Sequence, residues 1–320
     1  MRTLQNRRSF IKIASLSSAA AVLPFSTLKA RHLSGERKFR MSINPGSIGV
    51  NVSQEELLEA AVSHGFEAIV AFPSTLTDWS NDQIKEFVDK MKSSNITWGA
   101  AGLPYNFRGT QEAQDQGIQA LPKQARALET AGVTRMTTWI MPTHDSLTYL
   151  QNMKLHATRL GEAVRILGDH GIKFGLEYVG PKTLMASRKF SFVHSMAECQ
   201  DLIDAIGEPN VGFQLDSFHW FCAGETKEDL LKLSNDMIIT VDLNDARAGY
   251  SADEQIDGKR ELPVATGVID TKSFMEALVE IGYDGPVRAE PFNKVLNDMY
   301  NEEALKATYK AMSKAFSLVG

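Results

Sequence analysis

From residue 39 onward, the sequence alternates between short runs of β-branched and other apolar residues and longer stretches with the period of an amphipathic helix. The apolar runs predict eight strands, over residues 39–45, 66–72, 96–103, 133–140, 172–179, 211–218, 238–245 and 286–292. The intervening stretches predict helices, including 54–64, 82–94, 146–170, 196–206, 226–236, 270–281 and 301–318. This order is typical of parallel strands joined by crossover helices.

A glycine stands at several points where a predicted helix ends and the next strand begins. Glycine is common there because it readily adopts the left-handed conformation that ends a helix. They are Gly65, Gly132, Gly171, Gly207 and Gly282. Eight repeats of about 35 residues fit a single closed (βα)₈ TIM barrel of the α/β class. A doubly wound open sheet is the alternative. We expect one barrel domain over residues 39–320.

The first thirty residues have a different character. They contain five basic and no acidic residues, and Asn6-Arg7-Arg8-Ser9-Phe10-Ile11-Lys12 precedes a mild apolar run that ends near Phe25. This segment resembles a twin-arginine export signal, which implies recognition by the twin-arginine translocase and a periplasmic mature protein. An amphipathic helix is the alternative. Residues 31–38 would then be a linker, with the cleavage position left open.

The charge and the cysteine content of the mature chain limit the classes of partner that we expect it to bind. Without residues 1–30 the formal charge is about −10, which disfavours nucleic acid. The apolar run of about 13 residues is shorter than a bilayer span requires, and without a nearby cysteine we expect no stable membrane anchor. Cys199 and Cys222 are expected to be buried free thiols. The first strand–helix turn, residues 44–49, lacks a dinucleotide-binding fingerprint, and no Walker sequence occurs.

Four carboxylates stand at the ends of four successive predicted strands, where barrel enzymes carry their chemistry. They are Glu177, Asp216, Asp242 and Glu290. Brought together at the barrel mouth, they would repel one another by several kcal/mol at low effective dielectric. A cation is therefore expected between them. An all-oxygen set favours one hard divalent ion, Mn²⁺ or Mg²⁺, whereas Zn²⁺ more often takes histidine or cysteine.

The strings around these residues resemble the xylose-isomerase-like TIM-barrel family of sugar isomerases and epimerases, which includes the AP endonuclease barrels. The strings are Gly-Leu-Glu-Tyr (175–178), Leu-Asp-Ser-Phe-His (215–219), Asp-Leu-Asn-Asp-Ala (242–246), Arg-Glu-Leu-Pro (260–263) with Gly-Val-Ile-Asp (267–270), and Arg-Ala-Glu-Pro-Phe (288–292). The likeness covers roughly residues 40–318. The resemblance implies that the four carboxylate positions bind one metal ion and that Glu177 and Glu290 also move the proton.

Two departures from the family pattern stand out. The family's usual histidine on strand seven is Asp242 here, as in one metal site of xylose isomerase itself. Residues 263–267, Pro-Val-Ala-Thr-Gly, replace a common Pro-Gly-Glu-Gly run. They belong to a stretch of about 24 residues, 246–269, without a helix or strand pattern. Because loops of this length are usually functional, we expect it to lie over the ion as a lid.

Further residues near the strand ends are candidates for substrate binding. The resemblance implies that His219 contacts the substrate or the ion and that Arg247 touches substrate hydroxyls. His144 lies at the end of strand four, and Lys182 on the following loop is placed to polarise a carbonyl. For each, a solvated or satisfied polar side chain is the alternative. Trp79, Phe107, Trp139 and Trp220 are candidate sugar platforms, with core packing as their alternative.

Two carboxylates beside a metal-bound carbonyl suit removal of the proton α to that carbonyl. The sequence therefore predicts a divalent-metal-dependent sugar isomerase or epimerase, acting on a non-phosphorylated sugar if the protein is exported. A lyase or hydratase of keto-glycosides is the nearest alternative, since it shares the early step. A non-catalytic sugar-binding barrel and an AP-endonuclease-like phosphodiesterase are less favoured. The oligomeric state stays open, a homo-oligomer included.

Overall fold

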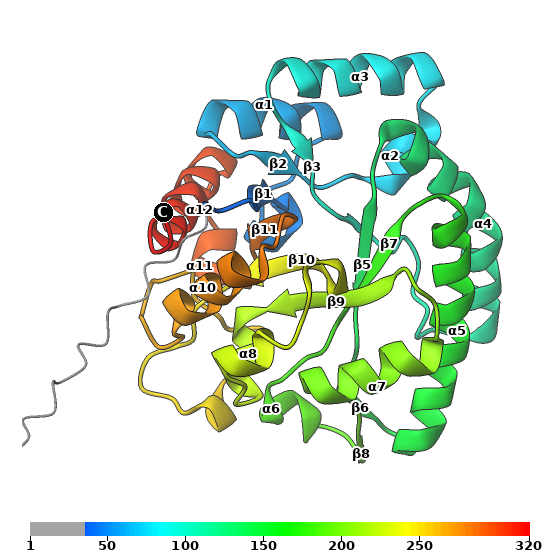
Figure 1. The fold of residues 1–320 in the computed structure, drawn as a ribbon, viewed down its shortest axis with the longest axis vertical. Helices are drawn as coiled ribbons and strands as arrows, with labels where there is room; N and C mark the ends of the chain where they lie inside the picture. The colour runs from blue at the N-terminus through cyan, green and yellow to red at the C-terminus, as the bar shows by residue number, and fades with distance from the viewer. Residues whose placement is uncertain (1–35) are drawn as a thin grey trace, which may run out of the picture. The chain divides into compact units, whose positions relative to one another are not determined.

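The computed structural model describes residues 36–320. The predicted export signal and most of the predicted linker lie outside these residues. Nine parallel strands form one sheet in the order β3-β2-β1-β11-β10-β9-β7-β5-β4 (Figure 1). They are β1 (Arg40–Ile43), β2 (Ala68–Ile69), β3 (Thr97–Trp98), β4 (Ala101–Gly102), β5 (Arg135–Trp139), β7 (Lys173–Glu177), β9 (Val211–Asp216), β10 (Ile238–Leu243) and β11 (Pro286–Ala289). A small antiparallel pair joins β6 (Thr143–His144) to β8 (Phe190–Ser191).

The predicted third strand, 96–103, is split into β3 and β4, and this split closes the barrel. The first half pairs with β2 and the second with β5, so the two ends of the sheet order are linked by Gly99 and Ala100. A Cβ on Gly99 would lie 2.6 Å from Ser42 Oγ, so only glycine fits the junction without a shift. All eight predicted strands are present, and the predicted barrel is confirmed.

The helices surround the sheet on the outside (Figure 1). The long ones are α1 (Gln54–His64), α3 (Asn81–Ser93), α4 (Gln111–Ala131), α5 (Tyr149–Asp169), α7 (Met196–Ile206), α10 (Thr271–Ile281) and α12 (Asn301–Phe316). Short ones are α2 (Pro73–Asp78), α6 (Lys182–Met185), α8 (Ser217–Cys222), α9 (Lys227–Leu230) and α11 (Lys294–Asn297), with 3₁₀ turns at Pro45–Ile48, Asn235–Met237 and Ala252–Glu254. The helix predicted over 226–236 is thus only α9 and a 3₁₀ turn.

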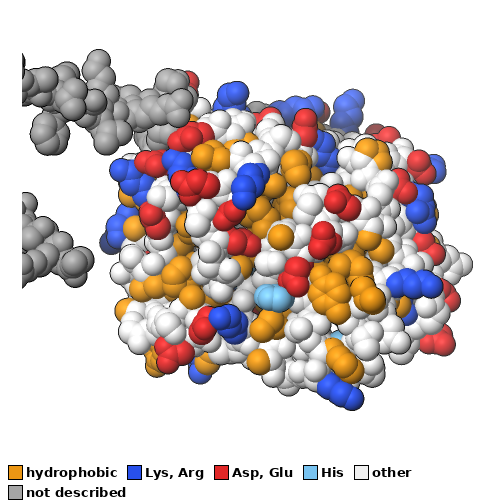
Figure 2. Space-filling view, turned by 60° about the horizontal axis from the view of Figure 1, so that its bottom comes forward, with side chains coloured by type: hydrophobic (Ala, Val, Ile, Leu, Met, Phe, Trp, Pro, Cys, Tyr) orange, Lys and Arg blue, Asp and Glu red, His pale blue; other side chains and the backbone are white. Residues whose placement is uncertain are grey.

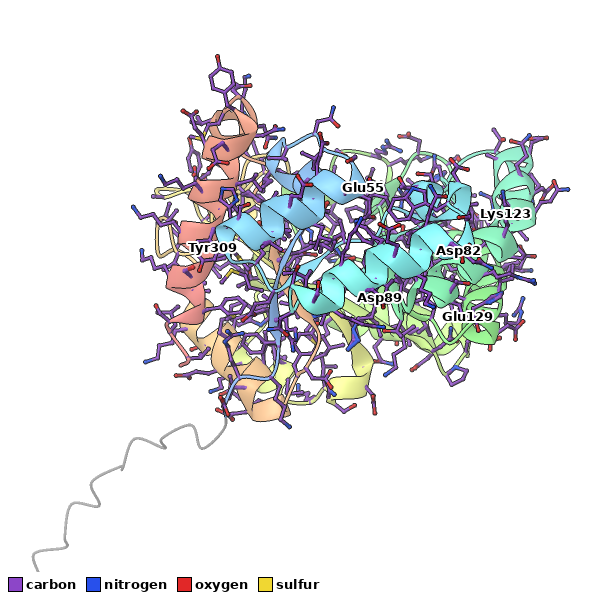
Figure 3. All side chains as sticks on the ribbon, turned by 90° about the horizontal axis from the view of Figure 1, so that it is seen from above. Glu55, Asp82, Asp89, Lys123, Glu129 and Tyr309 are labelled. Carbon is purple, nitrogen blue, oxygen red and sulfur yellow. The ribbon has the colours of Figure 1, made fainter. Side chains whose placement is uncertain are left out.

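The sequence pattern did not indicate α4, a helix of 21 residues with Pro122 inside it. The five glycines marked above all adopt positive φ, and four of them directly follow a helix. Charged side chains line the outer faces of the helices, for example Glu55 on α1 and Asp82 on α3 (Figure 3). None of the helices within 36–320 is long and apolar enough to span a bilayer.

The strand residues that alternate with Glu177, Asp216 and Asp242 carry large apolar side chains, which pack between the sheet and the helices. Phe174, Leu176, Phe213, Leu215 and Val241 are at most 1% exposed. The residues that alternate with them, such as Gln214 and Thr240, face the barrel interior below the carboxyl ends of the strands. Cys199 and Cys222 are buried and free, as predicted. On the face shown in Figure 2, acidic, basic and apolar side chains are interspersed.

The loop after β10 is organised by one buried carboxylate. Asp245 accepts hydrogen bonds from the backbone N–H groups of Ala246, Thr266, Gly267 and Ile269, so it ties both ends of the loop together. Its own backbone forms an antiparallel bridge with Glu261. The segment expected as a plain lid is therefore a folded loop whose middle returns to the barrel mouth.

Candidate active site

The four carboxylates at the strand ends converge. Glu177 ends β7, Asp216 ends β9, Asp242 is in β10, and Glu290 directly follows β11. The register of the ladder pairs Asp216 with Asp242 and Asp242 with Arg288, so these residues lie at one level of the barrel. One oxygen from each carboxylate lies within 4.8 Å of the others, and all four residues are buried.

Asp216 has partners on both of its oxygens. As the N-cap of α8, its Oδ1 accepts the backbone N–H groups of Phe218 and His219. Its Oδ2 accepts hydrogen bonds from Asn244 Nδ2 at 2.9 Å and from Arg260 Nη1 at 2.8 Å. The Asp216–Arg260 ion pair is fully buried, so the aspartate is compensated by a cation of its own.

Asp242 has a second arginine as its partner. Arg288 donates Nε to Oδ1 at 2.5 Å and Nη2 to Oδ2 at 3.2 Å, which is the two-point geometry of a strong arginine–carboxylate pair. Gln214 Nε2 also donates to Oδ2, at 2.7 Å. The aspartate that replaces the family's usual histidine therefore has its own guanidinium on the neighbouring strand.

Arg260 reaches the site from the long loop after β10. Its guanidinium is buried, donates to Asp257 Oδ1 at 2.7 Å, and lies 3.5 Å from Glu290 Oε2. The rings of Phe218 and Phe292 lie over the guanidinium carbon at 4.9 and 4.6 Å. Phe292 adopts a positive φ of 38°, an unfavourable backbone conformation that the surrounding contacts hold in place. The loop thus contributes a cation to the site in addition to covering it.

Glu177 and Glu290 are the two carboxylates that face the cavity. Glu177 Oε1 is buried and has no hydrogen-bond partner within residues 36–320. Glu290 has only long contacts, to Ser47 Oγ at 3.3 Å, Arg260 at 3.5 Å and Arg288 at 3.8 Å. Both residues line the cavity, whereas Asp216 and Asp242 lie behind it. The two aspartates are compensated by arginines, and the two glutamates are left free to react.

Burial raises the pKa of both glutamates. The pKa of Glu290 rises to about 8, mainly through burial and then through the charge of Asp242, against the opposing effect of Arg288. The pKa of Glu177 is raised well above its ordinary value by burial, with the charge of Glu290 adding to it. A carboxyl with a pKa near neutrality can both accept and return a proton, as general acid–base catalysis requires.

The donor set fits a divalent cation. Arg260 and Arg288 pair with two of the four carboxylates, so ionisation of both Glu177 and Glu290 would call for a further cation beyond those of residues 36–320. The unpartnered Oε1 of Glu177 is the kind of buried oxygen that a metal ion satisfies. Oxygen-only donors of this type suit hard divalent ions. Glu177 and Glu290 offer the freest lone pairs, because most of those on Asp216 and Asp242 already accept hydrogen bonds.

His219 lies beside the glutamates and is 1% exposed. Its Nε2 is 3.2 Å from Arg260 Nη2 and 3.6 Å from Glu177 Oε1. Burial, together with the positive charge of Arg260, lowers the pKa of His219 to about 3, so the ring is neutral at physiological pH. Because Arg260 can only donate, Nε2 accepts and the ring proton is on Nδ1.

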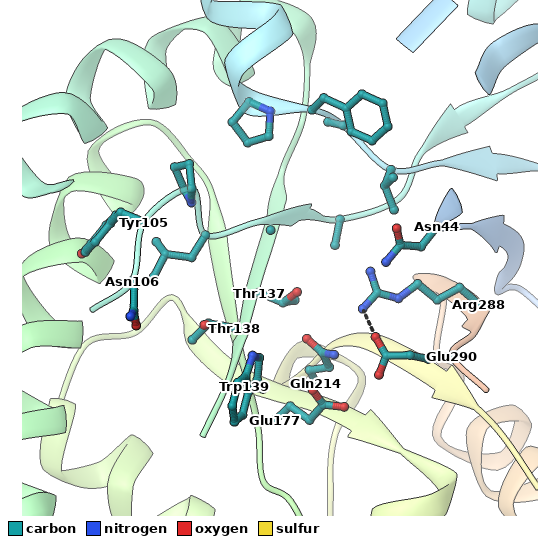
Figure 4. A pocket seen from close by; sticks show the side chains of 18 of the residues that line it. Asn44, Tyr105, Asn106, Thr137, Thr138, Trp139, Glu177, Gln214, Arg288 and Glu290 are labelled. Carbon is teal, nitrogen blue, oxygen red and sulfur yellow. Dashed lines mark ion pairs between the residues drawn. The ribbon is translucent and has the colours of Figure 1, made fainter. Parts of the chain in front are cut away.

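The cavity above these residues has a volume of about 590 Å³. Figure 4 shows Glu177, Gln214, Arg288 and Glu290 on its floor and Trp139 at its side. The remaining polar lining includes Asn44, Asn106, Arg108, Thr137 and Thr138. The cavity thus combines hydrogen-bonding groups with an aromatic wall, as small-molecule sites commonly do.

The other predicted contact residues lie away from this floor. Lys182 Nζ pairs with Asp253 at 2.7 Å, and Arg247 donates to the carbonyl of Glu254. Neither lines the cavity. His144 lines a smaller cavity nearby. Their roles toward a substrate stay predictions.

Of the four aromatic candidates, only Trp139 lines the main cavity. Trp220 packs edge-on against Phe274, and Trp79 packs against Phe87. Phe107 is 1% exposed and belongs to the core. For Trp79 and Trp220 the packing alternative is therefore the one observed, whereas Phe107 belongs to the core and also lines the smaller cavity.

The sequence reasoning missed Arg260, Arg288 and Gln214. Two signals in the sequence could have found the arginines. Arg288 precedes Glu290 by two residues, so strand alternation places both side chains on one face. Arg260 opens the Arg-Glu-Leu-Pro string that supported the family resemblance.

A closed parallel barrel with an acidic cluster at its carboxyl end defines a class of metal-binding or acid–base barrel proteins. The model of the xylose isomerase-like TIM barrel family matches residues 58–314, and the chain belongs to that family.

Three relatives illustrate the likeness. An inosose isomerase of Halalkalibacterium halodurans is 25% identical over 257 residues, which are 77% of this chain and 85% of that protein. A xylose isomerase domain protein of Alicyclobacillus acidocaldarius matches with a TM-score of 0.77 and 27% identity, over 88% of this chain and 99% of that one. The IOLI protein with a bound zinc atom matches with a TM-score of 0.71 and 22% identity, over 88% and 99%.

Proposed function

We propose that this protein is a sugar isomerase or epimerase that removes and returns a proton next to the carbonyl of a non-phosphorylated sugar through the glutamate pair. The observation that carries the proposal is that, of the four carboxylates, those of Glu177 and Glu290 face the cavity and accept no hydrogen bond from an arginine of residues 36–320, whereas those of Asp216 and Asp242 do. The names of the inosose isomerase relatives support the reaction class.

In the proposed reaction, one glutamate removes the proton from the carbon next to the sugar's carbonyl. For epimerisation, the other glutamate returns a proton to the opposite face of the same carbon. For isomerisation, a proton returns to the former carbonyl carbon, and the proton of the neighbouring hydroxyl passes to the former carbonyl oxygen. The raised pKa values suit both steps, because each carboxyl can hold a proton near neutral pH. Arg260 and Arg288 pair with the two aspartates behind them. Trp139 and the polar lining orient the ring.

We also propose that Glu177, Asp216, Asp242 and Glu290 together hold one divalent ion, Mn²⁺ or Mg²⁺, with the glutamates as its principal ligands. Such an ion supplies Lewis-acid polarisation of a carbonyl oxygen and stabilises the charge that develops there. The orphaned Glu177 Oε1 supports this, as does the zinc atom in the IOLI protein.

Removal of metal tests this part of the proposal. After dialysis against EDTA, we expect kcat on a keto-sugar or inosose substrate to fall by about 10²-fold or more, because several kcal/mol of charge stabilisation are lost. Adding back Mn²⁺ or Mg²⁺ should restore it. The assay follows substrate and product by chromatography and mass. Full activity in EDTA would contradict a metal requirement, and a product that has lost part of its mass would instead favour a lyase.

A further inference from the structure

A second, smaller cavity of about 210 Å³ adjoins the main one. It lies between the loop after β4, the loop after β5 and the first turns of α5. Its lining includes Phe107, His144, Asn152, His156 and Arg188. Arg108 lines both cavities, so its side chain stands between them. It donates to the carbonyl of Trp139 and stacks over the Trp139 ring at 3.9 Å.

Two buried side chains of this second cavity lack partners. His156 is 4% exposed and its Nε2 has no hydrogen bond within residues 36–320. Its Nδ1 is 3.0 Å from the carbonyl of Asn152, so Nδ1 carries the proton and Nε2 is a free acceptor. Asn152 is 2% exposed and its Oδ1 is likewise unpartnered. Buried polar atoms are normally satisfied, so these two indicate a ligand with hydroxyl donors.

A donor and an apolar wall complete this set. His144 Nδ1 accepts the backbone N–H groups of Ser146 and Leu147, which places its proton on Nε2 as a free donor. Phe107 and Leu155 supply an apolar surface. Free acceptors and a free donor facing an apolar wall are the complement of a pyranose ring with adjacent hydroxyls. Arg108 and Arg188 also line this cavity, but the two buried unpartnered atoms are acceptors, which favour a ligand with hydroxyl donors over an anion.

We propose that the second cavity binds the second sugar ring of a disaccharide or glycoside whose first ring occupies the main cavity. This extends the proposed function to a substrate class, glycosides, and rests on the main cavity binding a sugar. Arg108, stacked on Trp139, would lie against the bond between the two rings.

The test compares binding of glucose with binding of trehalose, maltose, cellobiose and sucrose by calorimetry. For the full chain, at least one disaccharide should bind about tenfold or more tightly than glucose. The variants Asn152→Leu and His156→Phe should each abolish this gain and leave the Kd for glucose within about twofold. Thr308→Val is a matched control, since Thr308 Oγ1 is also buried without a partner but lies on α12.

Thermal unfolding separates binding from folding in these variants. Because each removes an unpartnered buried polar atom, the Tm of all three should be equal to or above that of the unchanged protein. Only the two cavity variants should lose the disaccharide preference. The inference is overturned if no disaccharide binds more tightly than glucose, or if the preference survives both substitutions. A disaccharide preference without turnover of any sugar would instead overturn only the proposed reaction.

Discussion

Replacing Glu290 by glutamine is expected to lower kcat by about 10²- to 10⁴-fold, because the amide can neither accept nor return the proton. Glu177→Gln should have an effect of the same order. Both substitutions keep the shape of the side chain and replace a carboxyl group whose ionised form the buried cluster disfavours. We therefore expect the folded protein to be retained, with a Tm no lower than before, when both are measured in EDTA.

The same chemical change on the outer surface serves as the control. Glu86 on α3 forms an exposed ion pair with Lys90, and neither residue lines the cavity. Glu86→Gln should leave kcat unchanged. If the two cavity variants turned over substrate as fast as Glu86→Gln does, the glutamates would not be the proton-transfer groups.

Arg260→Met is expected to lower the free energy of unfolding by about 3–5 kcal/mol, because it leaves Asp216 and Asp257 without their cationic partner. Urea denaturation in EDTA measures this. Arg165 supplies the matched control, since its pair with Glu208 is largely exposed. Arg165→Met should lower the free energy of unfolding by less than about 1 kcal/mol.

A double variant isolates the ion pair from other effects. Adding Asp216→Asn to Arg260→Met removes the charge that the arginine compensates, so the double variant should be more stable than the sum of the two single losses implies. Strict additivity would show that the two side chains do not stabilise each other.

The barrel was predictable because its strands are apolar runs separated by regular helical stretches with glycines at their ends. Helix α4 could not be predicted in this way, because Pro122 lies inside it and the helix depends on its packing against α2, α3 and α5. The opposite error occurred at α9. The pattern over 226–236 predicted one helix, but the structure has the short α9 followed by a 3₁₀ turn that leads into β10.

The convergence of the carboxylates was also predictable, because the ends of parallel strands meet at one edge. The division of the four carboxylates into two arginine-paired aspartates and two cavity-facing glutamates could not be predicted. It depends on Arg260, which reaches the site from a loop without a periodic pattern, and on the register that sets Arg288 opposite Asp242. Asp245 accepts the backbone hydrogen bonds that hold the loop in its fold, and these bonds join residues about 20 positions apart. Such contacts leave no local signature in the sequence.

Turnover in D₂O tests proton transfer by the glutamate pair most directly. With a keto-sugar or inosose substrate, the unchanged protein should place deuterium on the carbon next to the carbonyl, detected by nuclear magnetic resonance. Glu177→Gln and Glu290→Gln should place almost none there. Product formed at the normal rate with no deuterium at any carbon would contradict proton exchange through these carboxyl groups.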